Sequence, residues 1–227
     1  MNELEMKKLW QTTYDKLEEN FVIHKKNTMD ITKVKVHSIL DSMKPIKIFT
    51  LLIGILWVGI GAIVLSEIYT KSFSGANKFF LFSATFQVLL TAAALLFYIY
   101  QLTKIYKVEV YDSILTTQKK LAQLKISTLW ATRIMFLQLP LWTTFYWNES
   151  MLENGNWFLW IIQGLVTLSF TYAALWLFFN IKLENKDKKW FEFLFKGKEW
   201  TPLMKSMELL KQIDAYTESE AEHNPGR

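Results

Sequence analysis

The sequence predicts an all-α membrane protein, a bundle of four transmembrane helices with amphipathic helices and a helical stalk in the cytoplasm. Two observations predict this class. Four long charge-poor stretches alternate with short charged segments, and lysine is distributed unevenly among those segments. A membrane-spanning helix needs about 20 mostly apolar residues. The four stretches are Ile48–Ser66, Phe79–Thr103, Ile134–Asn148 and Asn154–Ile181, the third being extended by Ile126–Thr132 if Arg133 snorkels.

The lysine distribution predicts the orientation of the spans. Cytoplasmic loops carry an excess of Lys and Arg. The segments 1–45 and 104–125 and the segment after Ile181 carry eight, five and eight lysines, whereas the loop 67–78 carries two and the loop 149–156 none. We therefore expect both termini and the central segment in the cytoplasm and two small loops outside.

The first 45 residues are predicted to form two short amphipathic helices. In the first, apolar side chains at spacings of four, four, three and four make one stripe, namely Met6, Trp10, Tyr14, Leu17 and Phe21. We expect a break at Asn27–Asp30 and then a second helix that carries Val36, Ile39, Leu40 and Met43. These stripes are too narrow for a core of their own, so they must lie on the membrane, on the rest of the protein or on a partner.

The central segment is predicted to be a stalk at about residues 104–127 within the membrane domain 46–181. Lys104–Ser127 has no Gly or Pro, so we expect two helices joined by a turn near Val108–Asp112. Asp112 or Ser113 is a suitable cap for the second helix.

The segment 182–217 is expected to hold a juxtamembrane aromatic run and a cytoplasmic helix. Lysines at Lys186–Lys189 adjoin Trp190–Phe195, a combination that suits the inner headgroup region. Thr201 and Pro202 are expected to begin the C-terminal helix. The polar tail 218–227 is predicted to be disordered.

Uncharged polar side chains inside the predicted spans are candidates for contacts between helices. These are Gln87, Gln138, Gln163, Thr167 and Thr171, the last three of which share one helix face. We expect them to join neighbouring helices by hydrogen bonds; a polar pore is the alternative. No Asp, Glu, Lys or His lies in the middle of a span, which disfavours pumps and catalytic membrane enzymes.

The sequence offers no chemistry for catalysis, so we predict a protein that is not an enzyme. It has no cysteine, and its three histidines are scattered at His24, His37 and His223. No motif for a phosphate loop, a hydrolase nucleophile or a zinc protease occurs, so we assign no catalytic, metal or cofactor residue. The net charge of +5 follows from the lysine distribution, and direct nucleic-acid binding is not expected.

The segment Asn2–Gln11, which reads NELEMKKLWQ, resembles the start of a group of small bacterial four-span membrane proteins. The resemblance covers about the first 60 residues by pattern and the rest by topology. It implies a membrane-tethered anti-sigma-factor regulator in the bacterial cytoplasmic (inner) membrane, with a sigma factor as its partner. The chain lacks the His–Cys zinc motif of the best-known anti-sigma domain, so that mechanism does not carry over.

Three functions remain open at this point. A regulator that sequesters a cytoplasmic partner would depend on Trp10 and its stripe. A structural accessory subunit of a larger membrane complex would depend on lipid-facing residues of the spans. A small channel or transporter, which we would expect to be a homo-oligomer, would depend on Gln87, Gln138 and Gln163.

Overall fold

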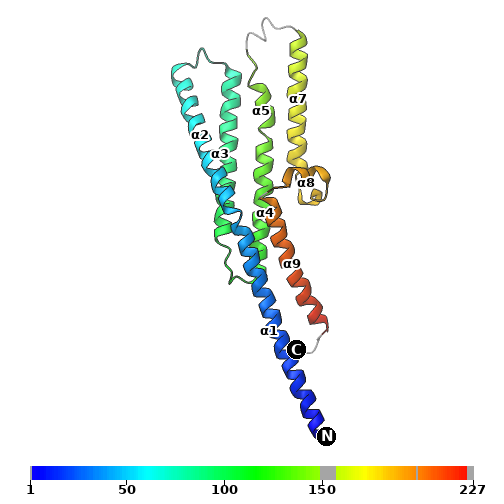
Figure 1. Ribbon diagram of the computed structural model, residues 1–227. Helices are drawn as coiled ribbons and strands as arrows, with labels where there is room; N and C mark the ends of the chain where they lie inside the picture. Colours follow the sequence, from blue (N-terminus) through cyan, green and yellow to red (C-terminus); the bar gives the residue numbers. More distant parts are fainter. Residues whose placement is uncertain (1, 149–156, 198, 224–227) are drawn as a thin grey trace.

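Figure 1 shows a computed structural model that describes residues 2–148, 157–197 and 199–223, in which every regular element is helical. The predicted all-α class is thus confirmed. The elements are α1 (Glu3–Asp41), α2 (Lys44–Lys71), α3 (Lys78–Tyr106), α4 (Ile114–Phe136), α5 (Leu139–Thr144), α7 (Trp157–Asn180), the 3₁₀ turn Leu183–Asn185, α8 (Lys189–Phe195) and α9 (Trp200–His223).

Three helices are long and apolar enough to cross a membrane, and they lie at one end of the molecule. They are α3, α7 and the apolar part of the helical run Glu3–Lys71, which is α2. The predicted third span is divided between α4 and α5. Pro140 lies in the first turn of α5 and cannot supply a backbone N–H to the preceding turn, so α4 ends at Phe136.

Close contact between α2 and α3 depends on two glycines of α2. A Cβ atom at Gly54 would lie 2.4 Å from Leu95 Cδ2, and one at Gly61 would lie 2.7 Å from Val88 Cγ2. The missing side chains allow the two backbones to approach closely, as small residues do between membrane helices.

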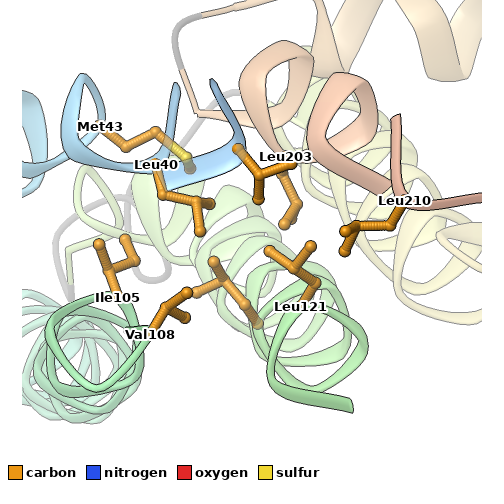
Figure 2. Close-up of a cluster of buried hydrophobic side chains, with 9 residues drawn as sticks. Leu40, Met43, Ile105, Val108, Leu121, Leu203 and Leu210 are labelled. Carbon is orange, nitrogen blue, oxygen red and sulfur yellow. The ribbon is translucent and has the colours of Figure 1, made fainter. Parts of the chain in front are cut away.

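The buried cluster with the most residues is drawn in Figure 2. It joins α1, the end of α3, the start of α4, and α9, through Val36, Leu40, Met43, Ile105, Val108, Leu121, Leu124, Leu203 and Leu210. The apolar stripe predicted for the second N-terminal helix therefore lies on the rest of the protein. The predicted stalk is consequently part of a four-helix core.

The N-terminal segment is one continuous helix, so the predicted break at Asn27–Asp30 is wrong. Thr28 Oγ1 donates to the carbonyl of His24 at 2.9 Å instead of capping a new helix. Met29 lines a hollow between α1 and α9, so α9 runs beside the helix where the sequence predicted its interruption.

The stalk turn is confirmed. Helix α3 ends at Tyr106 and α4 begins at Ile114, with Ser113 as its N-cap, since Ser113 Oγ accepts a hydrogen bond from the Thr116 N–H at 3.2 Å. Lys120 Nζ reaches back across the turn to Asp112 Oδ2 at 2.6 Å. These contacts close the turn between the two helices.

The C-terminal part of the chain packs against α4 and α1. In α8 and the segment before it, Ile181, Phe191 and Phe195 are buried with Leu129 of α4. Helix α9 begins at Trp200, one residue before the predicted start, and its backbone is helical to His223. The sequence assigns residues 218–223 to a disordered tail, whereas the structure draws their backbone as the end of α9; residues 224–227 lie outside the described ranges.

Candidate functional site

The arm, residues 2–24 of the chain, projects beyond every other helix (Figure 1). Apart from Glu18, which is partly buried, all its side chains are exposed. The five residues of the predicted stripe, which we call the arm stripe, are exposed to 49% (Met6), 74% (Trp10), 61% (Tyr14), 64% (Leu17) and 49% (Phe21). An apolar stripe of this length without a covering element is an unpartnered surface.

The arm stays helical because it continues a packed helix. Isolated helices are marginal in water because the first turn is costly to form. Residues 25–41 of α1 pack along α9, so the arm only has to propagate a helix that already exists. At its start, Asn2 and Glu5 form a capping box, with Asn2 N donating to Glu5 Oε2 at 3.1 Å.

Part of the arm stripe borders a shallow hollow. Leu9, Trp10, Thr13, Tyr14 and Leu17 surround about 230 Å³ of open space on the helix surface. A ridge of large side chains beside a hollow is the kind of relief that a facing helix or groove can match.

A second group, which we call the polar junction, lies between the apolar helices and the stalk core. Lys47, in the first turn of α2, is fully buried, and its Nζ donates to Gln101 Oε1 at 2.5 Å and to Glu199 Oε2 at 3.0 Å. The ammonium also lies 4.7 Å from the centre of the Tyr98 ring. The Tyr98 hydroxyl donates to Glu199 Oε1 at 3.2 Å.

The polar junction ties three distant segments together. Lys47 belongs to α2, Gln101 and Tyr98 to α3, and Glu199 to the residue just before α9. The ion pair and its hydrogen bonds hold the start of α9 against the first turn of α2 and the C-terminal part of α3. Sequence reasoning missed this group, because Lys47 at the edge of a span also fits a lysine facing lipid headgroups.

The predicted interhelical residues do not converge on one site. Gln138 Nε2 donates to Thr91 Oγ1 at 2.9 Å, and Gln163 Nε2 donates to the carbonyl of Thr143 at 2.7 Å. Thr171 Oγ1 bonds the carbonyl of Thr167 in its own helix. Among the described residues, Gln87 Nε2 and Thr167 Oγ1 are buried without a partner. Gln138 and Gln163 thus serve separate helix contacts.

Arg133 has a specific partner. Its Nε donates to the carbonyl of Ile181 at 2.7 Å, and its guanidinium lies 5.0 Å from the Trp130 ring centre. That carbonyl follows the last turn of α7 and has no helical partner of its own. The sequence had suggested only that Arg133 snorkels to the headgroups.

Comparison with known proteins adds no assignment. No family model, curated protein or solved structure matches the chain.

Proposed function

We propose that the protein is a membrane-anchored regulatory protein that sequesters a cytoplasmic protein partner on the arm stripe. A sigma factor is the candidate partner. The single observation that carries the proposal is the projecting arm, whose stripe of Met6, Trp10, Tyr14, Leu17 and Phe21 is exposed along its whole length.

The proposal places the chain in a bacterial inner membrane as a four-span bundle with both termini in the cytoplasm. Three apolar helices support the membrane location, and α4 with α5 would form the fourth span. The lysine-rich segments 1–45, 104–125 and 182–211 support the orientation. In this orientation the arm extends into the cytoplasm, where a soluble partner can reach it.

A helix-in-groove contact fits the chemistry of the arm. An amphipathic helix binds by laying its apolar residues in a groove, and a Trp at the centre of such a contact is often worth 2 kcal/mol or more. Trp10 and Leu17 lie seven residues apart, which places them two turns apart on one face. Charged residues that flank this face, such as Lys7 and Glu18, would form the polar rim.

The test uses full-length protein in its own membrane. Trp10→Ala with Leu17→Ala should release the partner while expression and insertion stay unchanged, because neither side chain packs on another helix. Lys8→Ala with Glu19→Ala is the matched control, since both residues lie on the opposite face of the same helix and the pair leaves the net charge unchanged. Purification in mild detergent followed by mass spectrometry identifies what the wild type and the control retain.

A transcription measurement distinguishes a sigma factor from other partners. Deleting the protein, or introducing the double substitution, should raise expression from promoters read by the sequestered factor. If the arm variants retain every partner that the wild type retains, and transcription is the same in all strains, the regulatory function is wrong. The regulatory function would also be wrong if the arm bound only anionic vesicles and no protein.

A further inference from the structure

A groove follows the contact between α2 and α3 on the side that also faces α5. Two hollows of about 300 and 220 Å³ meet in it at Trp57. The first contains Thr91 and Gln138, and the second contains Gln87 and Phe145. Along α2 the groove extends from Thr50 to Leu65, or about 22 Å at 1.5 Å per residue.

The rim of the groove has the spacing of a helix-packing seam. Ile53, Trp57, Ile60 and Val64 follow one another at intervals of four, three and four residues, line the hollows, and are about half exposed. This interval pattern is that of two helices packed at a shallow angle. The centres of the hollows lie about two helical turns apart, so a facing helix can place one side chain in each.

Gln87 determines which chemical group an occupant of the groove must carry. Its side chain lines the second hollow, only 4% of the residue is exposed, and its Nε2 has no hydrogen-bond partner among the described residues. Hydrocarbon chains contain no hydrogen-bonding groups, and an unsatisfied amide in the bilayer core is costly. The matching occupant therefore carries a hydroxyl or an amide at the depth of Gln87.

Helix α7 carries such groups on its outer face. Ser169 and Tyr172 are exposed, and neither hydroxyl has a hydrogen-bond partner among the described residues. They belong to a second seam at intervals of three and four, formed by Ile162, Leu165, Ser169, Tyr172 and Trp176. Tyr normally lies at the membrane boundary, whereas Tyr172 lies in the middle of a span.

The depths of the two surfaces agree. The hydrogen bond between the Ser83 and Thr144 hydroxyls and the one from Gln163 to the Thr143 carbonyl place α3, α5 and α7 at one common level. From this level, both α3 and α7 run toward the stalk (Figure 1). Gln87 lies four residues, about 6 Å, below Ser83, and Ser169 lies six residues, about 9 Å, below Gln163. The Tyr172 side chain leans back toward the same level, because helical side chains tilt toward the N-terminus.

We infer that the occupant of the groove is α7 of a second copy of this chain, with Ser169 and Tyr172 of one copy facing Gln87 of the next. No residue of α7 lines the groove, so the contact joins unlike surfaces and repeats into a ring or a row. The inference rests on the proposed membrane location and is independent of the arm and its partner.

Cysteine cross-linking between two differently tagged full-length copies in one membrane tests the contact, because the native chain has no cysteine. Ile60→Cys in one copy should form a disulfide with Ser169→Cys in the other, at least ten-fold more than Ile63→Cys does. Ile63 is the matched control, since it is exposed on the same helix and lines neither hollow. The inference would be overturned if the Ile60→Cys and Ile63→Cys copies gave equal yields of disulfide with Ser169→Cys. It would also be overturned if Ile60→Cys formed disulfides mainly with Ile60→Cys of another copy.

A second measurement uses exposed hydroxyls only, so that folding is not at issue. Tyr172→Phe should weaken association of labelled copies in vesicles of phosphatidylcholine and phosphatidylglycerol by about three-fold, the size of one average interhelical hydrogen bond. Tyr100→Phe, on exposed Tyr100 of α3, should leave association unchanged. A result in which the two variants behave alike would contradict the contact.

Discussion

The polar junction makes an asymmetric prediction about its two charged partners. Lys47 is fully buried, whereas 24% of the Glu199 side chain is exposed. Glu199→Gln leaves the buried ammonium without a counter-charge, and breaking a buried pair in this way costs about 3 kcal/mol. Lys47→Met leaves a carboxylate that water can reach, so we expect a loss of about 1 kcal/mol. The order of the two effects follows from burial alone.

The double variant isolates the interaction. In the Lys47→Met background there is no ammonium to leave unpaired, so adding Glu199→Gln should cost almost nothing. The coupling between the two sites is then about 3 kcal/mol, at the upper end of the range for contacting residues. The matched control is the pair Lys71–Glu67, also anchored in α2, which is 2.6 Å apart and highly exposed. The corresponding changes there should cost about 0.5 kcal/mol or less.

Hydrogen exchange of the α9 backbone amides is the appropriate assay, because Glu199 holds the start of α9. A loss of about 3 kcal/mol raises the population of the locally open state roughly 100-fold, and exchange accelerates by the same factor if α9 opens as a unit. Amides in the middle of α3 should be affected less. Two results would contradict this prediction. One is a loss of stability from Glu199→Gln that is the same in the wild-type and Lys47→Met backgrounds, and the other is a larger loss of stability from Lys47→Met than from Glu199→Gln.

Three further predictions concern packing, pH and orientation. Gly54→Ala should destabilise the protein by about 1–3 kcal/mol in denaturant titrations, because its Cβ would meet Leu95, whereas Gly59→Ala, with no atom within 4 Å, should not. Partial burial raises the pKa of Asp112, but hydrogen bonds from Lys120 and the Glu109 N–H and the charges of Lys120 and Lys33 outweigh burial and lower it below 3.8. Its stabilising effect should therefore be present above about pH 4 and disappear as the pH falls further, a dependence that Asp112→Asn should abolish in acid titrations of stability. An impermeant thiol reagent should label Ser74→Cys in intact cells but not Leu115→Cys; the opposite labelling would reverse the proposed orientation.

Features that depend on local sequence could be predicted. The apolar helices follow from uninterrupted hydrophobic stretches, and the Ser113 cap follows from a polar residue at the end of a stalk turn. The arm stripe follows from 3.6-residue periodicity and is exposed as a single face. Each of these is determined by residues within a few turns of one another, so one segment contains the whole signal.

Features that depend on distant segments could not be predicted. The expected break at Asn27–Asp30 relied on capping residues, but Thr28 and Thr32 bond carbonyls of their own helix, and Met29 lines a hollow between α1 and α9. Whether such residues cap or continue a helix depends on what lies beside them. The pairing of Lys47 with Glu199 spans 152 positions and depends on the return of α9 to the start of α2.

The anchoring of the C-terminal end of α1 explains why the arm has a fixed direction. At this end, Val36 and Leu40 are buried in the stalk core, and Met43 at the turn into α2 is fully buried. One turn later, Lys47 is bound to both α3 and α9. Since α1 has no break, this anchoring extends through 22 further residues of helix, about 33 Å. An arm held in this way presents Trp10 and Leu17 with little loss of conformational entropy on binding, which favours affinity for a protein groove.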